Sequence, residues 1–554
     1  MRAPRLLGAR QRHQSRQAAA RRGRAGPRWL AALAAVLTAA MVICVAPSAA
    51  RASGQSAATG PQNLTRALAT IENQPRYARA TWGYEVLGEK SGQVLAAQNA
   101  QSMFDPGSTM KIYSTATALR LYGPNYRFVT PAYREGTMSG STLNGDLVLV
   151  GSGDLSLGLR DQPNGTLYYE NLPNLDQSYA DIGLPGAVEP PGNPLAGLDQ
   201  IAAKVRASGI TAINGNVVVD DRLFSPYDGF PDGPVSAIWV NENLVDALVS
   251  PGPAGGPASV NWRPTTAAYT TTNQVTTVSA TSSTSLQITE PTPGNLVVTG
   301  QIAAGSTPTL VVHEVDDPAA FARSAFIEAL QEAGVTVTAP PGGSNPEALL
   351  PPRGSYQPGD MVGDYVSPPL SQFINLILKD SYNRGADLMT CLAAVKVGST
   401  NCQQGLVAEL QTVTKLGIPA KSVFLFDGAG SDDQGRTTVD ALASFLRRVA
   451  TTSYGPTLFR SLPDLGRNGT LADVLSKTRV AGHAQVKTGN RAVGSPTNQL
   501  MLLGNSLAGY VETKSGRHVT FMIAVGNVPL SSSSGVLAVT AQQAQMVAAI
   551  YKDL

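Results

Sequence analysis

The chain contains few of the residues that most often bind metal ions. Its 554 residues include 3 cysteines and 4 histidines, and His313, His483 and His518 are widely separated. No His-Glu-x-x-His sequence occurs, which argues against a zinc-dependent peptidase. We interpret these histidines as structural or solvent-facing, and we expect no metal and no cofactor.

Acidic residues are absent from the N-terminal segment, where residues 1–28 contain nine arginines. Residues 29–45 are apolar and rich in alanine, and Ala-Arg-Ala at 50–52 fits a small-x-small cleavage site. The pattern predicts an export signal over residues 1–52 and an extracytoplasmic location. A stretch of about 17 apolar residues is near the minimum that spans a bilayer, so a retained N-terminal membrane anchor is an open alternative.

The charge balance argues against nucleic acid as a partner. Removal of residues 1–52 takes away ten basic residues and no acidic ones, which leaves 32 basic against 39 acidic residues and a net charge of −7. A chain with excess negative charge has no net attraction to a phosphate backbone.

Only two cysteines remain outside the predicted signal, because Cys44 lies within it. Cys391 and Cys402 are 11 residues apart in a chain that we expect to be exported, which fits one local disulfide. Two free thiols are the alternative.

The length of the chain exceeds one ordinary hydrophobic core, so we expect more than one domain. Residues 81–98 read as a hairpin, and a helix is expected to begin at Ser108 and to end near Gly123. Helices and strands resume after residue 362. We therefore predict a discontinuous catalytic domain over 53–123 and 365–554, and a β-rich insertion of one or two accessory domains over 124–364.

Ser108 and Lys111 form the only Ser-x-x-Lys in the chain. Three residues make nearly one helical turn, so both side chains would lie on one face, with the hydroxyl at the positive end of the helix dipole. An amine in that place can accept the proton of the serine. The alternative is a capping serine followed by a surface lysine.

A second motif, Ser381-Tyr382-Asn383, lies between helical patterns at 370–380 and 386–395. A short corner between two helices can place a serine and an amide in a cleft. The other Ser-x-Asn sequences, at 259–261 and 399–401, lie in loop-like stretches.

A third motif, Lys487-Thr488-Gly489, follows an alternating strand pattern at 483–486. Gly489 would allow a substrate backbone to approach the strand closely. The similar sequence at 514–516 lies between two strand-like runs and reads as a hairpin turn.

Ser-x-x-Lys, Ser-x-Asn and Lys-Thr-Gly in this order resemble the signature of the penicillin-recognising serine enzymes. Ser381 lies 270 positions after Lys111, and such an insertion resembles the D-alanyl-D-alanine carboxypeptidase/endopeptidase family, the class C, type-4 penicillin-binding proteins. Three further stretches, at 151–154, 367–370 and 427–430, are similar to that family. The resemblance implies an α+β fold like that of penicillin-binding proteins and serine β-lactamases. Its five-stranded antiparallel sheet would combine the first hairpin with the last three strands, beside a helix near 539–551.

The resemblance also implies catalytic roles. Ser108 would attack the penultimate D-alanine of a peptidoglycan stem peptide, with Lys111 as base and Ser381 relaying the proton to the leaving amine. The backbone N–H groups of Ser108 and Asn490 would form the oxyanion hole. A lysine with a pKa near 10.4 is neutral in about one molecule in 2,500 at pH 7, so we expect burial and the charge of Lys487 to lower the pKa of Lys111.

The implied binding residues come from the second and third motifs. Asn383 would hold a substrate amide, Lys487 and Thr488 would bind the terminal carboxylate, and Gly489 would line the substrate strand. The expected partners are stem peptides ending in D-Ala-D-Ala, and β-lactam antibiotics as covalent inhibitors. The insertion shows no catalytic motif, so we expect it to position or exclude wall polymer and to be unnecessary for small substrates.

Two alternatives remain at this level. A class-A-type β-lactamase would need a deacylating glutamate, and Glu170 in Glu-Asn-Leu-Pro-Asn has the right letters but precedes Ser381. A weakly catalytic wall-binding protein on the same fold is the other. The family often continues Asp-Gly-Ser-Gly with a hydrophobe, serine and arginine, whereas Ser431, Asp432 and Asp433 follow here and Arg436 is the nearest arginine. Carboxypeptidase and endopeptidase preference therefore stay open.

Overall fold

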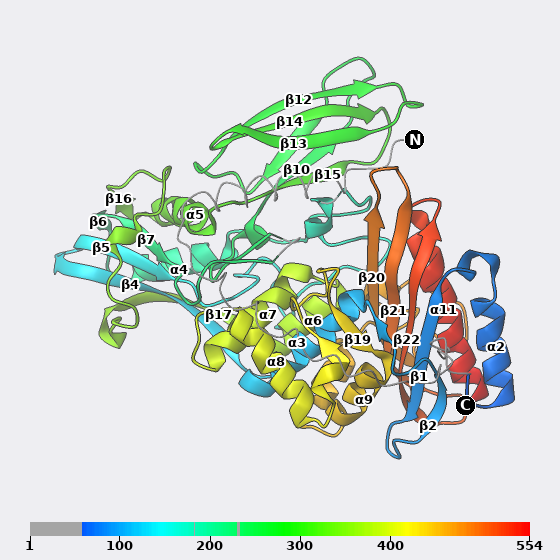
Figure 1. The fold of residues 1–554 in the computed structure, drawn as a ribbon. Helices are drawn as coiled ribbons and strands as arrows, with labels where there is room; N and C mark the ends of the chain where they lie inside the picture. The colour runs from blue at the N-terminus through cyan, green and yellow to red at the C-terminus, as the bar shows by residue number, and fades with distance from the viewer. Residues whose placement is uncertain (1–57, 182, 230–232) are drawn as a thin grey trace, which may run out of the picture.

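The computed structural model describes residues 58–181, 183–229 and 233–554 (Figure 1). The export signal predicted over residues 1–52 lies outside these ranges. No helix in the described ranges is both long and apolar enough to cross a membrane.

A five-stranded antiparallel sheet joins the two ends of the chain, as predicted. Its strand order is β2-β1-β22-β21-β20, so the first hairpin lies beside the last strand pair. Helix α11 packs on one face with α2 against it, and α9 packs on the other (Figure 1). The elements are β1 (Thr81–Gly88), β2 (Val94–Gln98), β20 (Ala484–Gly494), β21 (Leu500–Glu512), β22 (His518–Leu530), α2 (Gln62–Glu72), α9 (Val439–Val449) and α11 (Ser534–Asp553).

The helices beside α9 share the largest buried apolar cluster. Helix α3 lies among them and ends at Gly123, whose φ of 82° suits the glycine that commonly terminates a helix. The structure bridges Cys391 of α7 with Cys402 at the start of α8. The helices are α3 (Lys111–Tyr122), α6 (Leu370–Lys379), α7 (Asn383–Lys396), α8 (Gln403–Lys415) and α10 (Gly455–Ser461), with the 3-10 turn η3 (Gly107–Met110) directly before α3.

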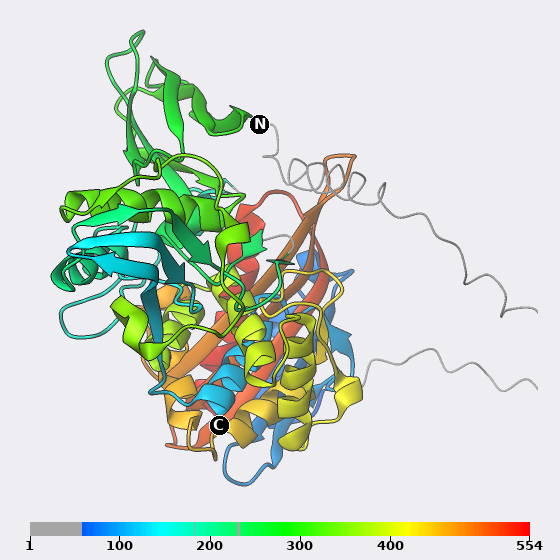
Figure 2. The same cartoon turned by 90° about the vertical axis from the view of Figure 1, so that its left-hand side faces the viewer.

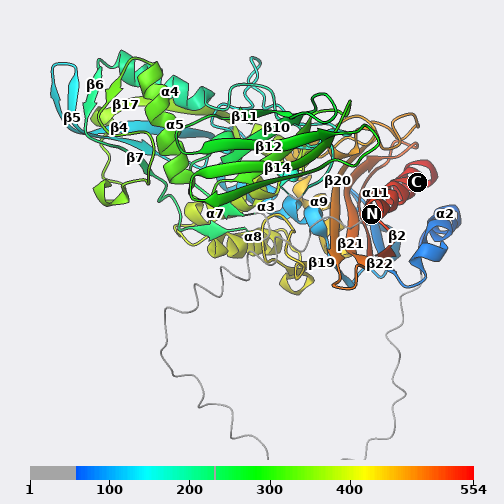
Figure 3. The ribbon, with the colours of Figure 1, turned by 90° about the horizontal axis from the view of Figure 1, so that it is seen from above.

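The inserted region begins with a six-stranded mixed sheet of order β16-β6-β5-β4-β17, in which β7 also pairs with β5. In Figures 1 and 3 this sheet lies at the end of the molecule opposite α2 and α11. Its last strand pairs with β4 and leads directly into α6. The strands are β4 (Arg127–Ser139), β5 (Thr142–Val150), β6 (Ala212–Asn214), β7 (Val217–Asp220), β16 (Thr336–Val337) and β17 (Met361–Pro369).

Two helices of the insertion, α4 (Ala196–Ala207) and α5 (Pro318–Glu332), pack on each other and against this region's sheet. Helix α5 is mostly buried, and Phe321 and Phe326 lie in the second apolar cluster. Its sequence is apolar on more than one side, which is typical of a helix enclosed by other elements.

Two three-stranded sheets complete the insertion, with orders β11-β10-β15 and β12-β14-β13. The second sheet forms the top of the molecule in Figures 1 and 2. Residues of β12 are largely exposed, in keeping with the half-solvated pattern of its sequence. The strands are β10 (Leu244–Ser250), β11 (Ser259–Arg263), β12 (Thr270–Val278), β13 (Ser285–Thr292), β14 (Asn295–Ala303) and β15 (Thr309–Glu314).

Candidate active site

Ser108 lies in the 3-10 turn η3 at the start of α3. Gly107 has a φ of 49°, and its N–H donates to the Asp105 carboxylate over 3.0 Å, which holds the turn. The Lys111 Nζ donates to the Ser108 Oγ over 2.8 Å. The three-residue spacing thus brings the two groups together, through a 3-10 turn rather than a regular α-helical one.

Lys111 is fully buried, and three oxygen atoms surround its ammonium group. Besides Ser108, Nζ donates to Asn383 Oδ1 over 2.6 Å and to the Ala429 carbonyl over 3.0 Å. A buried ammonium is costly unless it is hydrogen-bonded. These contacts satisfy it and aim the nitrogen at the nucleophile.

The Ala429 carbonyl comes from a loop between the short strands β18 (Val423–Phe424) and β19 (Arg436–Thr438). The Asp427 carboxylate accepts from the N–H groups of Gly430 (2.5 Å), Ser431 (2.8 Å) and Asp432 (2.6 Å), which fixes the loop. The sequence indicated this contact to Lys111 only through the family-like stretch at 427–430, because a backbone carbonyl leaves no mark in the sequence.

The second motif forms the predicted corner between α6 and α7. Ser381 has a φ of 60° in the left-handed region, and Asn383 begins α7. The Ser381 Oγ accepts from the Lys487 Nζ over 2.9 Å, while Asn383 faces Lys111. The corner thus contacts the lysines of both other motifs.

Lys487 is fully buried on β20 and donates to Ser381 Oγ and, over 2.9 Å, to the Thr488 carbonyl. Burial, and then the positive charge of Lys111, hold the pKa of Lys487 well below its usual range. Two neighbouring buried amines disfavour double protonation. In its neutral form, Lys111 would keep its two N–H bonds for Asn383 and Ala429 and turn its lone pair to the Ser108 Oγ.

Gly489 serves a different purpose from the one we expected. A Cβ at this position would lie 2.0 Å from the Pro106 carbonyl oxygen and 2.6 Å from the Ser506 Oγ. The absent side chain therefore lets the segment before Ser108 pack on β20, and the approach of a substrate to Gly489 stays a prediction. The Asn490 backbone nitrogen is also close, 2.5 Å from where a Cβ on Gly107 would lie.

Arg436 lies behind the nucleophile turn. Its guanidinium donates to the carbonyls of Asp433 and Gly435, each over 2.7 Å, and lies 3.9 Å from the Asp105 carboxylate. Burial raises the pKa of Asp105 to about 6, although Arg436 opposes the shift.

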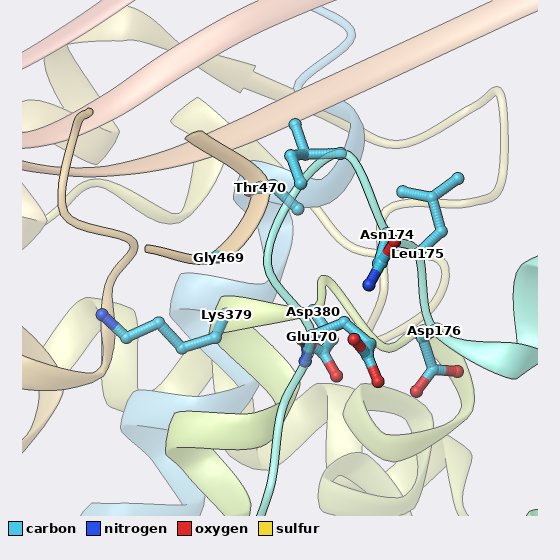
Figure 4. A pocket seen from close by; sticks show the side chains of 9 residues that line it. Glu170, Asn174, Leu175, Asp176, Lys379, Asp380, Gly469 and Thr470 are labelled. Atoms are coloured by element: carbon cyan, nitrogen blue, oxygen red, sulfur yellow. Dashed lines mark hydrogen bonds between the residues drawn. The ribbon is translucent and has the colours of Figure 1, made fainter. Parts of the chain in front are cut away.

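Residues 170–179 of the insertion lie against the catalytic corner, although they precede it by about 200 positions. The Glu170 N–H donates to Asp380 Oδ1 over 2.8 Å, and its carboxylate accepts from the Tyr168 hydroxyl over 3.1 Å. Figure 4 shows a pocket here, with the carboxylates of Glu170, Asp176 and Asp380 near one another and Lys379 pointing away from them.

Thr470 connects this pocket to the third motif. Its Oγ1 lies 3.3 Å from the Thr488 Oγ1. Glu170 lies far from the three motifs in the sequence. The tertiary structure brings it and Thr470 to the edge of the site. In the described residues, no group of three or more histidine, cysteine or acidic side chains could hold a metal ion.

The comparisons with known proteins agree with this geometry. The model of the D-Ala-D-Ala carboxypeptidase 3 (S13) family matches residues 64–549. A D-alanyl-D-alanine carboxypeptidase of Actinomadura sp. is 26% identical over 519 residues, which cover 89% of this chain and 86% of the relative. The D-alanyl-D-alanine carboxypeptidase DacB of Haemophilus influenzae is 22% identical and covers 70% of this chain and 75% of its own length.

A solved structure shares the fold. Penicillin binding protein 4 of H. influenzae superposes with a TM-score of 0.67 at 19% identity, over 88% of this chain and 99% of that chain. The family match extends from α2 into α11 and includes all three motifs. The chain therefore belongs to the D-Ala-D-Ala carboxypeptidase 3 (S13) family of serine hydrolases.

Proposed function

We propose that this protein removes the terminal D-alanine from peptidoglycan stem peptides that end in D-Ala-D-Ala, through an acyl-enzyme on Ser108. The observation that carries the proposal is the 2.8 Å contact between Ser108 Oγ and the buried Lys111 Nζ. It supplies a nucleophile and a proton acceptor in the one cleft that also holds the other two motifs.

In the first step, the Ser108 Oγ attacks the carbonyl carbon of the penultimate D-alanine while Lys111 takes the hydroxyl proton. The carbonyl oxygen becomes an oxyanion, which the N–H groups of Ser108 and Asn490 stabilise. The C–N bond then breaks, and the leaving amine receives a proton through Ser381, whose Oγ contacts Lys487. Water hydrolyses the ester in the second step and restores Ser108.

Recognition falls to the walls of the cleft. Lys487 and Thr488 bind the terminal carboxylate of the substrate, and Asn383 binds a substrate amide. A β-lactam presents a carboxylate and a reactive carbonyl in a similar arrangement, so it acylates the same serine. A structure of penicillin binding protein 4 of H. influenzae is in complex with a β-lactam, at a TM-score of 0.63.

The location follows from the chemistry and from the N-terminal pattern. Peptidoglycan is assembled outside the cytoplasm, and residues 1–52 read as an export signal. The protein is therefore proposed to act in the cell envelope, either released or held by its N-terminal segment. Fractionation of cells and N-terminal sequencing of the mature protein would distinguish the two forms.

The decisive experiment is incubation of the purified protein with defined muropeptides, followed by mass spectrometry of the products. Loss of one D-alanine from a pentapeptide stem supports the carboxypeptidase, and conversion of cross-linked dimers into monomers would add endopeptidase activity. The lifetime of the penicillin adduct tests the lactamase alternative, because a lactamase releases the acyl group quickly. Failure of Ser108 to acquire any acyl group would overturn the proposal.

A further inference from the structure

The corner that carries Ser381 has a backbone conformation that needs support. A non-glycine residue with a φ of 60° is locally strained and persists only where surrounding contacts hold it. We propose that Arg160 and Tyr179 of the insertion are positioning residues that hold the Ser381–Asn383 corner in its catalytic conformation.

Tyr179 makes the most direct contact. It lies in the 3-10 turn η4 (Gln177–Ala180), and its hydroxyl donates to the Ser381 carbonyl over 2.9 Å. The Asp176 carboxylate accepts from the Ser178 N–H over 2.9 Å at the start of this turn. The strained residue is thus held from outside its own helices.

Arg160 acts on the residue before Ser381. Its buried guanidinium donates to Asp176 and, over 2.6 Å, to Glu242 Oε1, and its Nη1 lies 3.7 Å from Asp380 Oδ2. The other Asp380 oxygen accepts from the Glu170 N–H. Both oxygens of Asp380 therefore face groups of the insertion, beside the pocket of Figure 4.

One arginine faces three buried carboxylates in this cluster. Without it, three carboxyl groups would remain in a poorly solvated place with like charges close together. Asp380 would then leave its present position or take up a proton, and Ser381 would move with it.

The other side of the corner is also held by the insertion. The Arg384 guanidinium lies 5.7 Å from the centre of the Trp239 ring and 3.6 Å from Glu314 Oε1. The catalytic region contributes a contact of its own through Lys379, whose Nζ donates to Asn468 Oδ1 over 2.7 Å. The corner is therefore clamped between the two regions.

Displacement of the corner would break the contacts from Lys487 to Ser381 and from Lys111 to Asn383. The insertion is consequently needed for the reaction of small substrates, in contrast to what its lack of motifs led us to expect. The inference rests on the proposed function only because acylation serves as one of its measurements.

The first experiment compares Tyr179→Phe with Tyr356→Phe. Tyr356 is a matched control, because its hydroxyl donates to Asp220 over 2.6 Å within the insertion, away from the corner. Loss of one well-placed hydrogen bond should slow acylation by fluorescent penicillin about tenfold in Tyr179→Phe, and Tyr356→Phe should keep the wild-type rate.

Hydrogen exchange of the same variants provides a readout that does not depend on catalysis. Peptides over 379–385 should exchange faster in Tyr179→Phe than in the wild type. In Tyr356→Phe, their exchange rate should equal that of the wild type. Wild-type acylation and exchange in Tyr179→Phe would overturn the proposal. Absence of acylation in the wild-type protein would instead overturn the proposed function, and the exchange data would still decide about the corner.

The second experiment compares Arg160→Met and Arg160→Lys with Arg323→Met. Arg323 is also buried in the insertion, but it donates to the Val217 carbonyl over 2.8 Å rather than to the corner. Arg160→Met should lower the acylation rate per folded molecule more than Tyr179→Phe does, and Arg160→Lys should recover part of it. Arg323→Met should affect only stability, and equal rates in the folded Arg160→Met and Arg323→Met proteins would contradict the proposal.

Discussion

The nucleophile and its neighbours show how much of this site depends on single atoms. Ser108 has one buried amine within hydrogen-bonding distance, and that amine is held by Asn383 and Ala429 as well. The motifs hold one other serine–lysine pair, in which the Lys487 Nζ donates to the Ser381 Oγ. Each side chain therefore has a distinct effect when it is removed.

Ser108→Ala should abolish covalent labelling by fluorescent penicillin while leaving the thermal unfolding midpoint almost unchanged, because only one oxygen atom is lost. Lys111→Ala should slow labelling by about 10³-fold or more through loss of the proton acceptor. The double variant should be no worse than Ser108→Ala, since residues that act as a unit are not additive. If Ser108→Ala were labelled at the wild-type rate, and the label were found on another residue, Ser108 would not be the nucleophile.

Asp105 should make stability depend on pH at the nucleophile turn. Its pKa is raised by burial from 3.8 to about 6, so the folded protein holds this proton more tightly than the unfolded chain. Stability from this group is then fully present below pH 4 and is lost as pH rises through 6, by up to about 3 kcal/mol.

Asp105→Asn removes that charge and retains an oxygen acceptor for the Gly107 N–H. The variant should match the wild-type free energy of unfolding near pH 4 and exceed it near pH 7.5. Denaturant unfolding at both pH values measures the difference. A variant that is equally stable or less stable than the wild type at pH 7.5 would show that the ionised carboxylate is well compensated by Arg436 and Arg491.

At the scale of elements, β20 carries both the proposed substrate-binding residues Lys487 and Thr488 and residues that serve packing. Gly489 lies against the Pro106 carbonyl. At Gly494, at the end of the same strand, an added Cβ atom would have no heavy atom of another residue within 4 Å. The two glycines form a matched pair.

Gly489→Ala should destabilise the protein by about 3 kcal/mol or more and slow acylation, because the added methyl group meets backbone that cannot yield. Gly494→Ala should change the free energy of unfolding by less than about 0.5 kcal/mol. Thermal unfolding and penicillin labelling of both variants measure the contrast. Equal unfolding temperatures and labelling rates of the two variants would mean that β20 can move away from the turn before Ser108 at little cost.

The bridge between Cys391 and Cys402 ties α7, the helix that Asn383 begins, to the start of α8. Replacement of both cysteines by alanine should lower stability by about 2–4 kcal/mol. Denaturant unfolding with and without reductant tests this, because reductant should affect only the wild-type protein. Alkylation of both thiols in denatured, unreduced protein would show that the bridge does not form.

At the scale of the whole molecule, we propose that a catalytic unit is held in place by a large insertion, whose parts differ in their distance from the site. The loop at 170–179 contacts the corner, whereas the β12-β14-β13 sheet lies at the top of the molecule and packs on a small apolar cluster (Figure 2). The role of positioning wall polymer, which we first assigned to the entire insertion, fits this distal sheet.

Replacement of residues 270–303 by a short flexible linker should therefore keep penicillin acylation within about twofold of wild type, because distant sites act independently. Cleavage of intact peptidoglycan should fall, since a surface for the polymer is gone. Release of D-alanine from sacculi and from a soluble peptide measures the two effects. Equal loss of both activities in a folded variant would show that the sheet also supports the active site.

Much of the fold was predictable because its signals are local. The hairpin, the helix that ends near Gly123 and the terminal helix appear where the patterns placed them, and the five-stranded sheet follows the resemblance. The sequence of residues 318–333 by itself predicts a surface helix, whereas α5 is buried, because its partners, α4 and β7, come from other parts of the insertion. The contacts of Ala429, Thr470 and Glu170 were not predicted, because a backbone carbonyl leaves no mark in the sequence and the other two residues reach the site only through the tertiary fold.

The sequence by itself determined the three motifs from which the proposed chemistry follows: a serine and a lysine one turn apart, a serine–amide corner between helices, and a lysine on a strand. These follow from spacings of two or three residues, at which side-chain direction is set by the local backbone. Only the tertiary structure decided how the corner is held. Arg160 and Tyr179 reach it across about 200 residues of chain, and contacts between such distant segments form only when the complete fold brings their buried charges and hydroxyl groups together.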